Sequence, residues 1–166
     1  MEQLQNRRSV LDCMLESIKR RGPDQSGVFE SRYAGLVHTR LAVADIENGR
    51  QPMTVIDGER KYTIVYNGRL FNTKDIRRRL YSEGVKFKTN SDTEVVLKAY
   101  IAWGERCLLE FNGVYAFAIW NSKEERLFLA RDRMGVKPLF FAMRNGALIF
   151  GSEIKALLKH PHVQPE

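Results

Sequence analysis

Four short apolar runs separated by turn signals organise the second half of the chain and constrain its fold most strongly. The loops Asn121-Ser122-Lys123 and Arg144-Asn145-Gly146 have the length and composition of hairpin connections. Hairpins join neighbouring strands in antiparallel order, whereas parallel strands need a crossover of roughly a dozen residues or more. We therefore predict antiparallel strands over residues 115–120, 127–131, 139–143 and 147–150.

Helical patterns alternate with further strands elsewhere. Apolar side chains recur at helical spacing over residues 9–21, with Ser9 as the N-cap and Gly22-Pro23 as the stop. Ser91 and Glu94 form a capping-box pattern before a helix that Gly104 ends. The other elements that we expect are helices over 73–83, 106–110 and 153–159, and strands around 28–29, 33–38, 41–44 and 61–66. This mixture predicts an α+β fold in one domain.

The composition fits a soluble globular domain, because 43% of the 166 residues are hydrophobic and 28% are charged. No apolar run approaches the roughly eighteen residues of a membrane span, and the polar start does not resemble a secretory signal. The two cysteines, Cys13 and Cys107, indicate neither a disulfide framework nor a zinc site, and we expect both to be buried. A cytoplasmic protein without membrane contact or a bound metal is therefore expected.

A net charge of +7 raises the question of nucleic-acid binding. Its two basic clusters, Lys19-Arg20-Arg21 and Arg77-Arg78-Arg79, each lie on an expected helix or at its end. Such runs are more often solvated faces or partners of carboxylates, and no basic stripe interleaved with aromatic residues accompanies them. We therefore favour a structural role for both clusters and expect no nucleic-acid partner.

An Asn-Gly pair follows the strand-like run over residues 62–66 and allows two interpretations. Asn67-Gly68 is first of all a signal for a hairpin turn. The same pair also offers a carboxamide and a backbone N–H, which are two donors for a developing oxyanion. Arg40 upstream and Asp92 downstream favour the second interpretation, because they can hold the charged ends of an amino acid.

Several short motifs follow one another in a specific order. They are Arg20-Arg21-Gly22-Pro23-Asp24, His38-Thr39-Arg40-Leu41, Gln51-Pro52-Met53, Tyr66-Asn67-Gly68-x-Leu70-Phe71-Asn72, Ser91-Asp92-Thr93-Glu94, Phe117-Ala118-Ile119-Trp120, Ala130-Arg131-Asp132-Arg133-x-Gly135-x-Lys137-Pro138-Leu139 and Ser152-Glu153-Ile154-Lys155-Ala156-Leu157. Together they resemble the glutaminase domain of asparagine synthetase, a class II glutamine amidotransferase with the N-terminal-nucleophile fold. The resemblance covers nearly all of the chain from Arg20 onward.

The resemblance implies a four-layer αββα sandwich of two antiparallel sheets with helices outside. Residues 1–160 would form the glutaminase domain, amino-terminally truncated and without its first strand, and 161–166 would begin a linker. The linker would lead to a synthetase domain, absent from this sequence, that uses ATP and Mg²⁺, and no cofactor is expected in the glutaminase domain itself. L-Glutamine and the C-terminal synthetase domain are the implied partners, and a homodimer is a candidate assembly.

The resemblance also implies a role for each candidate site residue. The planar guanidinium of Arg40 would clamp the α-carboxylate of glutamine, and Asp92 would hold its ammonium. Asn67 and Gly68 would be the catalytic oxyanion donors. The positions that would complete the glutamine site are Leu41, Ala42, Val43, Ala44 and Arg69.

Each of these roles has a structural alternative. The sequence alone favours a surface or structural ion-pair arginine at Arg40, and Asp92 begins a helix whose dipole stabilises a carboxylate without any ligand. We interpret Arg20, Arg21 and Asp24 as structural pairs near the mouth of the site. Three aromatic residues, Tyr115, Phe117 and Trp120, are expected in the core and not at the ligand.

Two departures from the family pattern bear on activity. The nucleophile of the family is a cysteine at the mature N-terminus whose own α-amine is the base, whereas this sequence begins Met1-Glu2-Gln3. Arg69 stands where the family usually has glutamate, so a positive charge would face the ammonium of the substrate. The sequence therefore predicts a glutaminase domain that would supply ammonia for amide transfer to aspartate, but a polypeptide that is itself inactive. The alternative is a non-catalytic amino-acid-binding or regulatory module.

Overall fold

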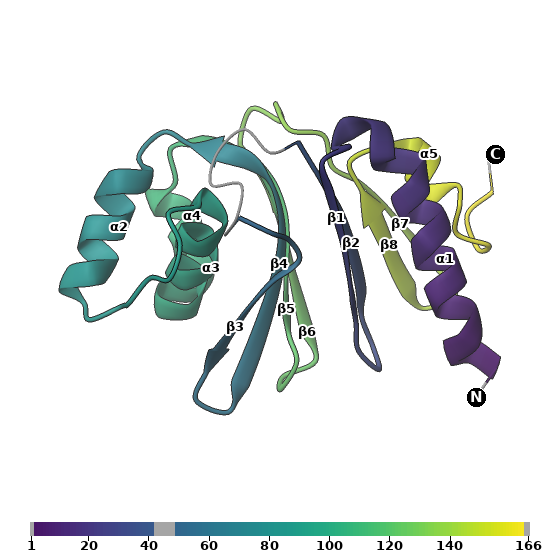
Figure 1. Ribbon diagram of the computed structural model, residues 1–166, viewed down its shortest axis with the longest axis horizontal. Coiled ribbons are helices and arrows are strands. Elements are labelled where there is room, and N and C mark those ends of the chain that lie inside the picture. The colour runs from purple at the N-terminus through teal and green to yellow at the C-terminus, as the bar shows by residue number, and fades with distance from the viewer. Residues whose placement is uncertain (1, 42–48, 165–166) are drawn as a thin grey trace.

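The computed structural model describes the backbone of residues 2–41 and 49–164, with side chains from Arg7 onward. Two layers of antiparallel strands face one another, and helices cover both outer faces (Figure 1). Helix α1 (Glu2–Ile18) and the short α5 (Ile154–Leu157) lie outside one layer, and α2 (Thr73–Ser82) and α3 (Asp92–Trp103) lie outside the other. This is the predicted α+β sandwich.

The second layer is a four-stranded sheet in the order β3-β4-β5-β6. Its strands are β3 (Met53–Asp57), β4 (Arg60–Leu70), β5 (Gly113–Asn121) and β6 (Arg126–Arg131). Side chains alternate between its two faces. Tyr62, Ile64 and Phe117 project toward α2 and α3 and belong to the main hydrophobic core, whereas Ala116 and Ala118 line the space between the layers.

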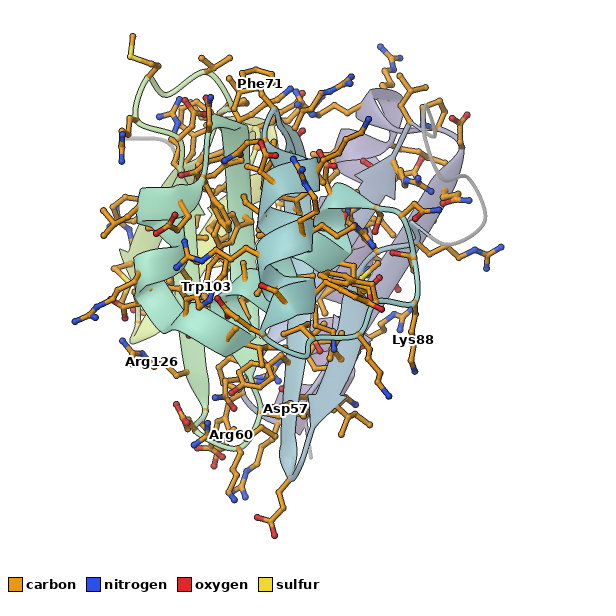
Figure 2. The ribbon with its side chains drawn as sticks, turned by 90° about the vertical axis from the view of Figure 1, so that its left-hand side faces the viewer. Asp57, Arg60, Phe71, Lys88, Trp103 and Arg126 are labelled. Carbon is orange, nitrogen blue, oxygen red and sulfur yellow. The ribbon has the colours of Figure 1, made fainter. Side chains whose placement is uncertain are left out.

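The helical side of this sheet is closed by two helices and a short connection. Figure 2 looks onto this face, with the β3–β4 hairpin tip at Asp57 and Arg60 and the opposite end of the sheet at Phe71. Helix α3 is largely buried and is followed by a 3₁₀ turn, η2 (Gly104–Arg106), and α4 (Cys107–Glu110). Gly104 takes a φ of 60°, a left-handed conformation that suits glycine at the end of a helix.

The first layer consists of two separate hairpins. Strands β1 (Gln25–Glu30) and β2 (Gly35–Arg40) form one, and β7 (Phe140–Arg144) and β8 (Ala147–Gly151) form the other. A 3₁₀ turn, η1 (Lys19–Arg21), connects α1 to this layer. A smaller cluster of Met14, Ile149 and Leu157 packs the two outer helices against the hairpins.

The structure corrects several boundaries. Helix α1 begins at Glu2, so Ser9 lies inside it and is not its N-cap, and strand β3 was not predicted at all. The strand predicted over 41–44 lies almost wholly in residues 42–48, outside the described residues. Cys13 is exposed, contrary to the prediction, whereas Cys107 is buried as predicted. Among the described residues, no helix is long and apolar enough to cross a membrane.

Arginine side chains of both basic clusters form ion pairs with carboxylates. Arg79 reaches Glu83 and Glu110 and also covers the ring of Trp103. Arg21 pairs with Glu153 at 3.2 Å. Neither cluster therefore forms a continuous unpaired basic face in the described part of the chain. The aromatic side chains of Tyr115, Phe117 and Trp120 are all buried, as predicted.

Candidate active site

A cavity of about 2140 Å³ lies between the two layers. Arg40 on β2, Asn67 and Gly68 on β4, and Asp92 at the start of α3 all line it. These residues come from three elements that are distant in sequence, and the fold brings them to one space.

Asn67 and Gly68 lie inside β4, so the hairpin interpretation of this pair is wrong. Gly68 is paired with Tyr115 of β5, but the backbone N–H and C=O of Tyr115 bond to Asp132 at 3.2 and 2.8 Å. Gly68 and Tyr115 are therefore a non-hydrogen-bonded pair, and the backbone groups of Gly68 point to the other edge of β4. A Cβ at this glycine would lie 2.4 Å from the Val114 carbonyl oxygen, which explains why glycine stands here.

The edge of β4 to which Gly68 points is open toward the cavity. The pairing of β4 with β3 ends at Ile64. Two side chains from other elements cover part of the remaining edge, one bonded to the backbone of Tyr66 and the other to the N–H of Leu70. Gly68 lies between them, and alternate residues of a strand direct their backbone groups to the same edge. Its N–H is thus directed toward the cavity, next to the side chain of Asn67.

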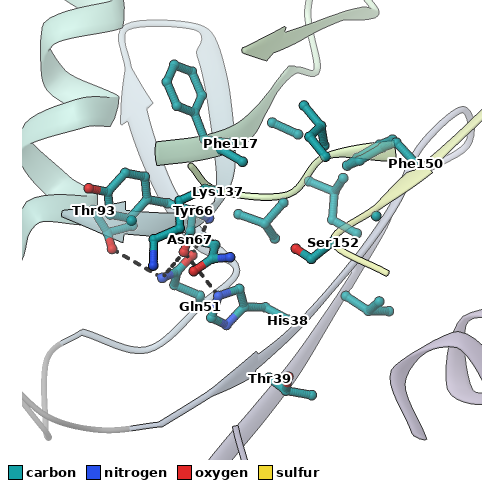
Figure 3. A pocket seen from close by; sticks show the side chains of 18 of the residues that line it. His38, Thr39, Gln51, Tyr66, Asn67, Thr93, Phe117, Lys137, Phe150 and Ser152 are labelled. Atoms are coloured by element: carbon teal, nitrogen blue, oxygen red, sulfur yellow. Dashed lines mark hydrogen bonds between the residues drawn. The ribbon is translucent and has the colours of Figure 1, made fainter. Parts of the chain in front are cut away.

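The backbone of Tyr66 is held by two side chains (Figure 3). Its N–H donates to Gln51 Oε1 at 2.6 Å, and its C=O accepts from Gln51 Nε2 at 3.0 Å. His38 Nε2 lies 3.1 Å from the same carbonyl oxygen. Burial lowers the pKa of His38 from 6.5 to about 4, and the positive charge of Arg40 acts in the same direction. The imidazole is therefore neutral at neutral pH.

Asp92 connects the start of α3 to the end of β4. Its Oδ2 accepts from the Leu70 N–H at 3.1 Å, and its Oδ1 accepts from the Thr73 hydroxyl at 2.9 Å. A carboxylate has about four lone-pair sites, so two remain for an ammonium. Ser91 caps α3 by accepting from the Glu94 N–H, as predicted.

The capping box is formed only in half. The buried carboxylate of Glu94 does not return to Ser91, but accepts from the N–H groups of Lys88 and Thr89 at 2.9 and 2.6 Å. Glu94 therefore fixes the loop before the helix, and this loop leads directly to Asp92. The helix start that carries Asp92 is thus held from both sides.

The remaining predicted site residues have different surroundings. Arg40 lies at the end of β2, where Nη1 donates to Gln25 Oε1 at 2.8 Å. Leu41 follows it and is exposed, whereas Ala42, Val43 and Ala44 lie outside the described residues. Arg69 is exposed and lines the cavity, so its guanidinium can turn toward solvent.

Neither cysteine of the sequence lines the cavity. Cys13 is on the exposed side of α1, and Cys107 lies within the main core behind the four-stranded sheet. Burial raises the pKa of the Cys107 thiol to about 12, so it stays protonated at neutral pH. The described lining of the cavity therefore includes Asn67 and Gly68 but neither cysteine.

Sequence reasoning did not assign a role to Gln51, His38 or Thr93. All three occur in the quoted motifs, but nothing local indicates what they contact. Gln51 Nε2 also lies 3.2 Å from the Thr93 hydroxyl, which is buried in the first turn of α3. Only tertiary structure brings Gln51 and His38 to the backbone of Tyr66, and Thr93 to the side chain of Gln51.

The two-layer antiparallel sandwich with helices on both outer faces is the architecture that the sequence led us to expect for a glutamine amidotransferase domain. The model of the glutamine amidotransferase domain family matches residues 1–166, and the chain belongs to that family. It is 47% identical over 163 residues to asparagine synthetase [glutamine-hydrolyzing] 3 of Bacillus subtilis (strain 168), covering 98% of this chain and 26% of that protein. It is 34% identical over 142 residues to asparagine synthetase B [glutamine-hydrolyzing] of Escherichia coli (strain K12), covering 85% and 25%. The chain thus spans about a quarter of the length of these relatives.

Solved structures share the fold. The glutamine phosphoribosylpyrophosphate amidotransferase from B. subtilis, in complex with ADP and GMP, superposes with a TM-score of 0.75 at 24% identity, over 89% of this chain and 40% of that one. A structure described as the allosteric regulatory enzyme of purine biosynthesis gives 0.65 at 26% identity, over 75% and 29%. The N-terminal-nucleophile amidotransferase fold expected from the sequence is therefore confirmed.

Proposed function

We propose that the cavity binds L-glutamine as a free amino acid. Arg40 pairs with the α-carboxylate and Asp92 with the α-ammonium, while Asn67 and the Gly68 N–H donate to the carboxamide oxygen. The observation that carries this proposal is the open edge of β4, where the Gly68 N–H is directed into a space that Arg40 and Asp92 also line. Opposite charges at two points and paired donors at a third match the three polar groups of glutamine.

The donors favour acyl transfer chemistry at the carboxamide. As a nucleophile adds to the carboxamide carbon, negative charge develops on its oxygen, and preorganised N–H donors stabilise that charge. Release of ammonia from the tetrahedral intermediate would follow. The attacking thiol is not supplied by Cys13 or Cys107, because neither lines the cavity. We therefore propose that the 166-residue polypeptide binds glutamine without hydrolysing it and, by itself, is an amino-acid-binding module.

As part of a longer protein, such a domain would be the glutaminase part of an asparagine-synthetase-like amidotransferase. The names of the relatives support this proposal, since both are glutamine-hydrolysing asparagine synthetases. The ammonia would pass to a synthetase domain that uses ATP and Mg²⁺ to transfer it to aspartate. The residues described here would need no cofactor for their part.

Calorimetric titration with L-glutamine tests the binding proposal. We expect saturable heat with the unmodified polypeptide, and at least about tenfold weaker binding in Arg40→Met, which keeps much of the side-chain stem and removes the charge. Asp92→Asn should behave alike, because the amide oxygen still accepts from the Leu70 N–H. Arg126→Ala is the control, since Arg126 pairs with Glu105 on the surface away from the cavity.

The outcomes separate the two parts of the proposal. Absence of saturable heat with either glutamine or glutamate would refute the binding site. Glutamate production above the uncatalysed background, abolished by Asn67→Ala, would refute the prediction that this polypeptide is inactive.

A further inference from the structure

One carbonyl oxygen lies at the centre of the candidate site. The Tyr66 C=O accepts from Gln51 Nε2 at 3.0 Å and lies 3.1 Å from His38 Nε2. It belongs to the peptide group that leads directly into Asn67. Both side chains that reach it come from other segments of the chain, and Figure 3 shows them converging on this point.

Gln51 occupies the position of a strand partner. It accepts from the N–H and donates to the C=O of Tyr66, the two bonds that a residue of a neighbouring strand would make. Pairing with β3 has already ended at Ile64, so the side chain extends the ladder by one residue. The backbone of Gln51 is also tightly packed, since a Cβ at Gly27 would lie 2.2 Å from its carbonyl oxygen.

His38 must donate from Nε2, because its neighbour is a carbonyl oxygen. The neutral ring then has a bare Nδ1, which is buried and has no hydrogen-bond partner among the described residues. An unpaired buried acceptor lowers the stability of the folded protein, so stability alone does not explain this ring position. The bond to Tyr66 therefore points to a functional role. His38 precedes Arg40 by two residues on β2 and therefore projects from the same face.

From this geometry we infer that His38 and Gln51 are positioning residues for the oxyanion donors. They occupy both lone pairs of the Tyr66 carbonyl and so fix the peptide plane that sets the direction of Asn67 and Gly68. The bond from His38 connects that peptide group to β2, the strand that carries Arg40. The side chain of Gln51 connects it to the start of α3, which carries Asp92, because Gln51 also bonds to Thr93. This inference rests on the proposed function and adds how the two oxyanion donors are held in their direction.

A positioning role predicts a selective effect on ligands. L-Glutamine and L-glutamate place an oxygen at the donors, whereas L-norleucine has the same charged ends and an apolar side chain. Loss of the His38 bond to the Tyr66 carbonyl should weaken glutamine and glutamate binding but leave norleucine binding nearly unchanged. A merely structural role of His38 would weaken all three ligands alike.

The experiment compares His38→Leu with His38→Gln in calorimetric titrations of the three amino acids. We expect the ratio of glutamine affinity to norleucine affinity to fall about tenfold in His38→Leu, and to return toward the unmodified value in His38→Gln, whose amide can donate to Tyr66. Thr93→Val should lower the ratio less, because it removes only the partner of Gln51. An unchanged ratio in His38→Leu, or equal weakening of all three ligands, overturns the inference.

A second measurement does not need a ligand. In ¹H–¹⁵N spectra, the Asn67 side-chain and Gly68 backbone amide resonances should shift in His38→Leu and return in His38→Gln, while amides of the β3–β4 hairpin tip stay unchanged. Unmoved Asn67 and Gly68 resonances overturn the inference even if no amino acid binds. If the resonances move but no ligand binds to the unmodified polypeptide, His38 does position Asn67 and Gly68, and only the proposed function is refuted.

Discussion

Replacing His38 by glutamine should remove a specific part of the acid sensitivity of the fold. The imidazole has a pKa of about 4 in the folded protein against 6.5 in the unfolded chain, mainly because it is buried. Between these values the unfolded state binds more protons, so the free energy of unfolding falls as the pH is lowered from about 6.5 to about 4. At about 1.4 kcal/mol for each pH unit, the loss is at most about 3 kcal/mol.

The assay is urea unfolding of the unmodified protein and of His38→Gln at several pH values from 4 to 7. Carboxylates such as Asp132 and Glu153, whose pKa values are lowered by hydrogen bonds, are present in both proteins and cancel in the difference. Relative to the variant, the unmodified protein should lose about 2 to 3 kcal/mol of stability between pH 7 and pH 4. Equal losses in both proteins would show that the ring is not held in a neutral, desolvated state.

Three further predictions concern single positions. Gly68→Ala should lower the free energy of unfolding by about 3 kcal/mol or more, because its Cβ would meet the Val114 carbonyl oxygen at 2.4 Å, and urea unfolding measures this loss. In a thiol-reagent assay on the folded protein, Cys13 should react within minutes and Cys107 only after denaturation, so rapid reaction of two thiols would contradict the structure. Arg69→Glu should strengthen glutamine binding by about three- to tenfold, a modest gain because the side chain is exposed, and weaker binding in calorimetry would exclude this account of Arg69.

Local patterns were sufficient for most elements of the fold. The short apolar runs and hairpin loops of the second half correspond to β5 to β8, and the cap at Ser91 marks the start of α3. Patterns failed where neighbouring elements decide. The start of α1 before Ser9 is one such case, since the Arg7 guanidinium bonds to the carbonyl of Ser31 at 2.7 Å, a contact that no local signal contains.

The chemistry of the candidate site was also partly accessible from sequence. The motifs indicated which residues can hold the two charged ends of an amino acid and which offer oxyanion donors. They could not tell a turn from a strand at Asn67 and Gly68, because an Asn-Gly pair suits both. The distinction comes from the pairing of Gly68 with Tyr115 across β4 and β5.

The sequence by itself determined the type of fold, the order of most elements and the identity of the polar residues that a glutamine site would use. Periodicity and turn chemistry are local properties, so the chain carries them without reference to its partners. Tertiary structure alone decided that the Gly68 N–H is directed to an open edge and that His38 and Gln51 meet at the Tyr66 carbonyl. Such contacts join residues far apart in the chain, and their geometry depends on how whole strands and helices pack.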